Sequence, residues 1–151
     1  MCGRFTLLSN IEDLSARFGF TSGRTQILPD YNVAPEQQVL AVTDHEGNTR
    51  AEFMKWGLTP HWNTNHSKNL SFINARIETV NIKPSFESAF RYRRCLIVAN
   101  GFYEWHREHK PPTPYYFQLQ HLLITISMNP HLWYHLQLKK CLIFLEGIKN
   151  S

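Results

Sequence analysis

Long hydrophobic runs are missing from this chain of 151 residues. No apolar stretch approaches the roughly 20 residues that a membrane-spanning helix needs, so the sequence argues against such a helix. The first residues, Met1 to Arg4, also lack the apolar segment of a secretion signal. We therefore expect a cytoplasmic protein.

Cysteine is scarce as well. Cys2, Cys95 and Cys141 are odd in number, lie far apart and form no CxxC pair, which argues against a disulfide framework and against structural zinc. Cys95 lies in an apolar run and is expected in the core. His131 and His135 have the i, i+4 spacing of two metal ligands, but no third ligand and no HExxH motif accompany them. We expect no metal and no other cofactor.

Charged residues make up only 19% of the chain and hydrophobic residues 42%, which is typical of one packed globular domain. Lysine and arginine (16) outnumber aspartate and glutamate (12), so the net charge is +4 and the pI is near 9.1. This mild excess favours a polyanionic partner without establishing one.

Short strands dominate the predicted elements. A capping box of Ser9 and Glu12 predicts one amphipathic helix that ends at Gly19. Residues 38–43 and 51–56 read as strands around a turn at 44–48, with Met54 and Trp56 on one face of the second strand. Trp56 is expected in the core.

The middle of the chain predicts a short helix over 84–90 and strands over 95–99, 102–106 and 115–119. The strands 95–99 and 102–106 can pair as a hairpin around Asn100-Gly101 or form one strand that bends at Gly101. Together these elements indicate an α+β fold with a largely antiparallel sheet.

The last third is different, because turn signals nearly vanish. From Gln118 to Ser151 the only acidic residue is Glu146 and the only glycine is Gly147. We assign no element there. The predicted division is a domain over 1–117 and a divergent or truncated segment over 118–151.

Cys2 follows the initiator methionine directly, where a small side chain permits removal of Met1. An N-terminal cysteine carries an α-amine of pKa about 7.7–8.0 beside a thiol of pKa about 8.5. These two nucleophiles can close on one aldehyde carbon as a thiazolidine ring. For an isolated Met-Cys pair, a cysteine without such a role is the plainer interpretation.

Five motifs in order change that assessment. Together they resemble the abasic-site processing family, also called SOS response-associated peptidases or the SRAP family, and the resemblance covers about residues 1–117. The motifs are MCGRFT (1–6), YNVAP (31–35), WGLTP (56–60), INARIET (73–79) and GFYEW (101–105). The resemblance implies an SRAP-like fold with a largely antiparallel, barrel-like sheet core and a few short helices.

The resemblance also implies a site. Cys2 corresponds to the family's N-terminal cysteine, Asn74 to its active-site asparagine and Glu104 to its catalytic glutamate. An amide can hydrogen-bond the sugar without titrating, and a carboxyl can carry protons. Taken singly, Asn74 is more simply a turn residue and Glu104 a salt-bridged strand residue.

The DNA-facing positions implied by the resemblance are Arg4, Asn32, Pro35, Trp62 and Arg76. A guanidinium offers paired donors to a phosphate, and an exposed tryptophan can stack on a base. Asn74 and Arg76, two residues apart on an extended segment, would point to one side. For Trp62, core packing has nearly even weight. The arginines at 91, 93 and 94 form a run that can attract DNA or be a solvated face.

One part of the family pattern is absent: the sequence has no Ile-His-x-Arg-Met-Pro segment, which carries a further histidine in the family. Its loss affects proton transfer, a contribution of about 10²–10⁴ in rate.

The expected function is processing and shielding of abasic sites in single-stranded DNA through a covalent crosslink from Cys2. Lyase and self-processing peptidase activities, and a role in the SOS response to DNA damage, accompany it in the family. The expected protein is a monomer without a membrane partner. The alternatives are a DNA-binding remnant that forms no crosslink and a cysteine peptidase, although no histidine is placed near Cys2.

Overall fold

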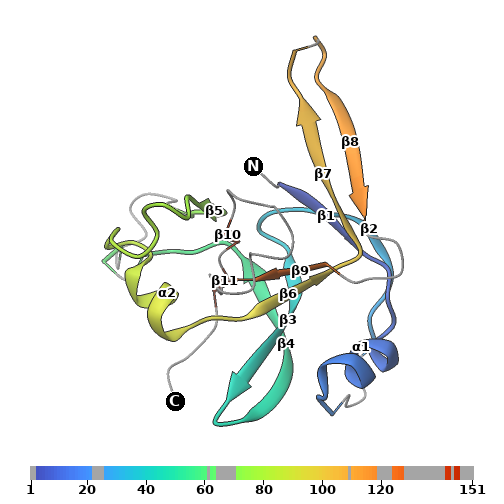
Figure 1. Ribbon diagram of the computed structural model, residues 1–151, viewed down its shortest axis with the longest axis vertical. Helices are drawn as coiled ribbons and strands as arrows, with labels where there is room; N and C mark the ends of the chain where they lie inside the picture. Colours follow the sequence, from blue (N-terminus) through green and yellow to red (C-terminus); the bar gives the residue numbers. More distant parts are fainter. Residues whose placement is uncertain are drawn as a thin grey trace.

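A computed structural model describes residues 3–21, 26–60, 62–63, 71–108, 110–118, 124–127, 142–143 and 145–146 of the chain. Within these residues two short helices accompany three mostly antiparallel sheets, in the strand orders β2-β1-β7-β8, β11-β4-β3-β6-β9 and β10-β5 (Figure 1). The α+β class predicted from the sequence is confirmed. The described sheets are not closed into a barrel.

The first sheet contains β1 (Arg4–Leu7), β2 (Asp30–Val33), β7 (Gly101–His106) and β8 (Thr113–Gln118). The second contains β3 (Gln38–His45), β4 (Asn48–Trp56), β6 (Leu96–Ala99), β9 (Ile124–Ser127) and β11 (Leu145–Glu146). The small sheet joins β5 (Asn74–Ala75) to β10 (Leu142–Ile143). The helices are α1 (Ile11–Phe18) and α2 (Glu87–Tyr92).

The helix α1 ends at Gly19 as predicted, in the left-handed conformation (φ 72°). Its predicted N-cap is wrong by one residue: the side chain of Asn10, not of Ser9, accepts the hydrogen bond from the Asp13 N–H at 2.8 Å. Asparagine and serine are both good N-caps, and Ser9 is engaged elsewhere, accepting a hydrogen bond from Asn100 Nδ2.

The hairpin β3–β4 confirms the two predicted strands, but both run further than predicted and the turn is shorter than 44–48. Its two-residue loop, Glu46 and Gly47, has positive φ at both positions, as the twist of a tight hairpin requires. On β4, Met54 and Trp56 are buried and Phe53 is exposed, so the predicted faces are confirmed. Trp56 is completely buried in the core.

The strands β6 and β7 do not pair with each other, because they belong to different sheets. The chain passes from one sheet to the other at Asn100-Gly101, which fits the second of the two arrangements considered, a strand bent at Gly101. Asn100 fixes this corner: its Oδ1 accepts hydrogen bonds from the N–H groups of Leu8 (2.6 Å) and Ser9 (3.2 Å).

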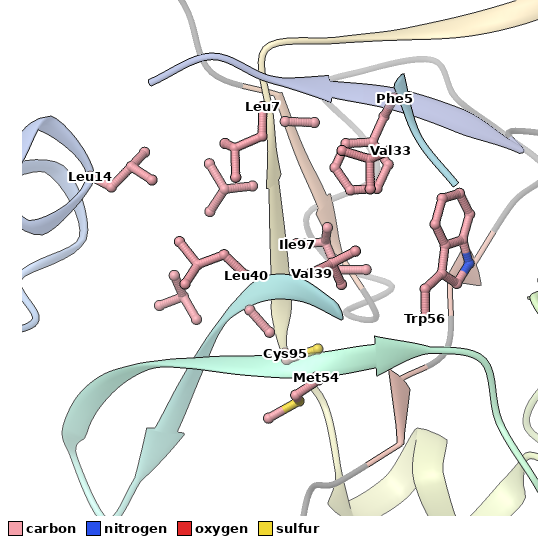
Figure 2. Packing of buried hydrophobic residues seen from close by; sticks show 14 of the residues in the cluster. Phe5, Leu7, Leu14, Val33, Val39, Leu40, Met54, Trp56, Cys95 and Ile97 are labelled. Atoms are coloured by element: carbon pink, nitrogen blue, oxygen red, sulfur yellow. The ribbon is translucent and has the colours of Figure 1, made fainter. Parts of the chain in front are cut away.

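The main core lies between the two large sheets and α1 (Figure 2). Phe5, Leu14 and Ile97 are among its most buried members, from β1, α1 and β6. A second, smaller cluster surrounds Phe86 and Val80 next to α2. The helix predicted at 84–90 is confirmed in place but begins and ends later, over Glu87–Tyr92.

The strands β7 and β8 pair along their length and project from the body as an arm (Figure 1). Glycine is required at position 101, where a Cβ would overlap the ring of Tyr116. The Tyr116 hydroxyl reaches across to Thr6 Oγ1 at 2.9 Å, so this ring covers the glycine and ties the arm to β1.

The three short strands after Gln118 add to the sheets: β9 pairs with β6, β10 with β5 and β11 with β4. The sequence predicted no element there, and the division at 117/118 remains a prediction. Cys141, His131 and His135 lie outside the described residues. Among the residues that are described, no helix is long and apolar enough to cross a membrane.

Candidate functional site

Three of the predicted site residues, Arg4, Asn32 and Glu104, lie near the start of β1. The described chain begins at Gly3, so Met1 and Cys2 lie outside the described residues. Arg4 is paired with Tyr103 in the antiparallel ladder between β1 and β7, which puts the first residue of β1 beside Glu104. Two motifs that are about a hundred residues apart in the sequence therefore meet at one point.

Arg4 and Asn32 form one part of this site. The Arg4 Nη1 donates a hydrogen bond to Asn32 Oδ1 at 3.0 Å, between the neighbouring strands β1 and β2. The Tyr103 hydroxyl donates to the carbonyl of Tyr31 at 3.1 Å and ties β2 to β7. Two of the five predicted DNA-facing residues, Arg4 and Asn32, are thus neighbours on one face of the sheet.

Glu104 belongs to the other face of the same sheet. Side chains alternate along a strand, so Glu104 shares its face with Phe102 and Phe5, whereas Arg4 shares its face with Tyr103. Glu104 lies opposite Tyr115 of β8 and is half-buried. A phosphate held by Arg4 and a proton carried by Glu104 would therefore lie on different sides of the strand pair.

Asn74 is connected to β1 through Trp56. The rings of Phe5 and Trp56 pack with their centroids 5.4 Å apart, at one end of the core (Figure 2). The indole Nε1 of Trp56 donates a hydrogen bond to the carbonyl of Ile73 at 3.0 Å, next to Asn74. Because Phe5 lies on the Glu104 face, this contact brings the β5 segment to the same side of the sheet as Glu104.

The strand β5 itself depends on the last third of the chain. Asn74 pairs with Ile143 of β10, and Trp56 pairs with Leu145 of β11. The backbone beside the candidate asparagine is therefore held by a segment for which the sequence alone indicated no structure.

A second set of contacts fixes the loop that contains Asn32 and Pro35. The Glu36 N–H donates to the Trp56 carbonyl at 2.9 Å, and the Glu36 carboxylate pairs with Lys55 Nζ at 2.5 Å. The Lys55 ammonium holds the pKa of Glu36 below its usual value. Glu36 thus joins the loop to the end of β4. Pro35 is half-buried in this loop.

The supporting residues Trp56, Glu36 and Gly57 were missed as site residues. A Cβ at Gly57 would overlap Ser71 Oγ, so glycine permits the close approach of the 71–74 segment. The only sequence signal was their position: Glu36 follows YNVAP, and Trp56-Gly57 opens WGLTP.

Arg76 and Trp62 stand apart from these contacts. Arg76 is exposed just beyond β5, whose pairing ends at Ala75, so a common direction with Asn74 remains a prediction. Trp62 is 51% exposed, so it is not a core residue. Of the arginine run, Arg91 pairs with Glu87 at 3.0 Å and Arg94 is exposed.

Cys95 is buried in the core, and desolvation raises the pKa of its thiol to about 12. A thiol that stays neutral is a poor nucleophile. Within the described ranges no group of three or more His, Cys, Asp or Glu side chains is placed to hold a metal ion.

The chain is similar to several proteins of known name. The abasic site processing protein YoaM of Bacillus subtilis (strain 168) is 42% identical over 111 residues, which cover 71% of this chain and 48% of YoaM. The abasic site processing protein YedK of Escherichia coli (strain K12) is 28% identical over 121 residues, covering 77% and 53%. The chain thus spans about half the length of the curated relatives it matches.

Solved structures share the fold. A protein from Bacteroides thetaiotaomicron superposes with a TM-score of 0.70 at 20% identity, over 83% of this chain and 58% of its own. A phage-related protein from Bordetella bronchiseptica gives a TM-score of 0.64 at 25% identity, over 83% and 59%. The profile of the SOS response associated peptidase (SRAP) family matches residues 1–147. The chain therefore belongs to the SRAP family.

Proposed function

We propose that this chain processes abasic sites in single-stranded DNA and shields them through a covalent bond from Cys2. The observation that supports this most is the pairing of Arg4 with Tyr103, which brings the start of β1 beside Glu104. The names of the relatives, abasic site processing proteins, point to the same substrate.

The proposed chemistry begins with hydrolysis of the Met1–Cys2 bond, which frees the α-amine of Cys2. This amine condenses with the aldehyde of the ring-opened deoxyribose and releases one water. The thiol sulfur then adds to the imine carbon, and its proton passes to the nitrogen. The product is a five-membered thiazolidine that links the protein to the DNA.

The described residues would assist these steps in different ways. Glu104, half-buried beside the start of β1, would take a proton from the nucleophile and return one to the opened sugar oxygen. Asn74 would hydrogen-bond the amine or the sugar oxygen. Arg4 and Arg76 would bind phosphates, and Trp62 would stack on a base. Lyase activity at the abasic site and self-processing peptidase activity, in the response to DNA damage, belong to the same proposal.

The test is crosslinking to a single-stranded oligonucleotide with one abasic site, followed on a denaturing gel. We expect a shifted band with the wild-type protein and none with Cys2→Ala. Cys95→Ala is the matched control and should keep the band, because the Cys95 thiol is buried. Glu104→Gln should slow the reaction by about 10²- to 10⁴-fold.

Intact-mass measurement of the purified protein accompanies the gel. A wild-type protein without Met1 that forms no band, or a Cys2→Ala protein that forms an equal band, rejects the covalent mechanism. Salt-sensitive binding to the intact oligonucleotide without a crosslink would instead support the DNA-binding alternative.

A further inference from the structure

Among the described residues, β8 is an edge strand of its sheet. Each of its six residues, Thr113–Gln118, pairs with a residue of β7, and the described residues provide no strand on its other side. All six residues are exposed. A free edge of this length presents unpaired backbone donors and acceptors to another strand.

The side chains of this edge are unusually apolar. Tyr115, Tyr116 and Phe117 are 52%, 40% and 48% exposed, and Trp105 of β7 is 38% exposed near them in the arm. The strand has the sequence TPYYFQ and carries no charge. Natural edge strands are usually protected by charged side chains, prolines or bulges, and β8 has only Pro114 near its start.

We propose that β8 is an interaction surface for a second copy of this chain, which pairs its own β8 antiparallel to the first. In a twofold arrangement centred on Tyr116, Tyr115 of one copy lies opposite Phe117 of the other. Every aromatic side chain of the strand then faces an aromatic side chain, and cross-strand aromatic pairs stabilise such ladders.

The exposed aromatic area and the uncharged sequence of β8 favour a second copy of this chain as the partner. Aromatic side chains offer about 150–250 Å² each, so the four exposed ones supply roughly 300–450 Å² per copy. The aromatic area of both copies, together with the area of the paired strand backbones, approaches the ~1,000 Å² that the smallest specific interfaces bury. No charge of β8 is buried on pairing. A nucleic acid backbone would need cations, and β8 itself has none: Arg107 and Lys110 lie in the turn of the arm, and Arg4 lies two strands away on β1.

The experiment measures mass by sedimentation velocity between about 1 and 100 µM protein, without DNA. The variants are Tyr115→Lys and a matched control, Phe53→Lys, whose ring is 49% exposed in the β3–β4 hairpin of the other sheet. We expect the wild type and Phe53→Lys to reach twice the 17.8 kDa chain mass. Tyr115→Lys should raise the dimer Kd at least about tenfold, because charges on an edge oppose pairing.

Circular dichroism shows whether Tyr115→Lys is folded. If it is not, Thr113→Lys on the same strand replaces it, since Thr113 is exposed at the end of the strand. A wild type that is monomeric at every concentration overturns the proposal. A Phe53→Lys variant that raises the dimer Kd as much as Tyr115→Lys does also overturns it. A monomeric wild type whose affinity for single-stranded DNA falls with Tyr115→Lys assigns the edge to nucleic acid instead. None of these readouts depends on Cys2 crosslinking.

Discussion

At the scale of single residues, burial distinguishes Cys95 from a reactive cysteine. Cys95 lies among core residues that include Ile97 and Met54, and the transfer of its thiolate out of water is unfavourable. The pKa of this thiol is therefore raised to about 12. The reactive role proposed for Cys2 depends on its place next to Met1, so the thiols of Cys2 and Cys95 should differ sharply in labelling.

We predict that iodoacetamide at pH 8 leaves Cys95 unmodified in the folded protein and modifies it in urea. Intact-mass spectrometry of the double variant Cys2→Ala, Cys141→Ala, in which Cys95 is the one remaining cysteine, measures this. The pKa of the Cys95 thiol is higher in the folded state than in the unfolded state. The contribution of this thiol to the free energy of unfolding is therefore complete below about pH 9 and is lost as the pH rises towards 12. Between pH 8 and 11, the midpoint temperature of thermal unfolding should fall more steeply for the wild type than for Cys95→Ala. Parallel pH curves for the two proteins would contradict this.

At the scale of elements, the corner between β6 and β7 is held by Asn100. Its Oδ1 accepts from two successive N–H groups in the link between β1 and α1, and the Asn100 N–H donates to the Thr6 carbonyl at 2.8 Å. From the sequence, Asn100-Gly101 indicated either a hairpin turn or a bend, because both need the same residue types. Only the pairing partners of β6 and β7 distinguish these possibilities.

Asn100→Ala should lower the free energy of unfolding by about 2–3 kcal/mol, because it leaves two partly buried N–H groups without their acceptor. Asn100→Asp keeps an acceptor oxygen for both groups and loses only the Nδ2 donor to Ser9 Oγ, so it should lower the free energy of unfolding by less. Urea unfolding monitored by tryptophan fluorescence gives both values. Equal losses for the two variants would show that the acceptor oxygen is not what holds the corner.

At the scale of the whole molecule, Trp56 joins the main core to the segment that bears Asn74. Its ring packs on Phe5, its Nε1 binds the Ile73 carbonyl, and its backbone pairs with Leu145. It therefore contacts the N-terminal strand, the candidate asparagine's neighbour and the last third of the chain at once. The same motif, WGLTP, supported the family resemblance, although Trp56 itself was expected only in the core.

Trp56→Phe should destabilise the protein by about 2–4 kcal/mol, through the lost hydrogen bond and the space left in the core. It should also slow crosslinking to abasic DNA in the fraction that remains folded, because the Asn74 segment loses its anchor. Met54→Leu, a buried change of similar volume on the same strand face, is the control and should cost less than about 1.5 kcal/mol. A folded Trp56→Phe protein that crosslinks at the wild-type rate would contradict the anchoring role.

The sequence by itself determined the short elements and the ordered motifs, because hydrophobic alternation, capping residues and turn glycines act over a few neighbouring positions. It predicted α1 up to Gly19, the hairpin β3–β4 and the buried side chains of Met54 and Trp56. Only the tertiary structure decided that β6 and β7 enter different sheets, that Arg4 and Glu104 lie on opposite faces, and that β10 pairs beside Asn74. These are pairings between strands distant in the chain, and their free energy depends on which surfaces meet, which local periodicity does not encode.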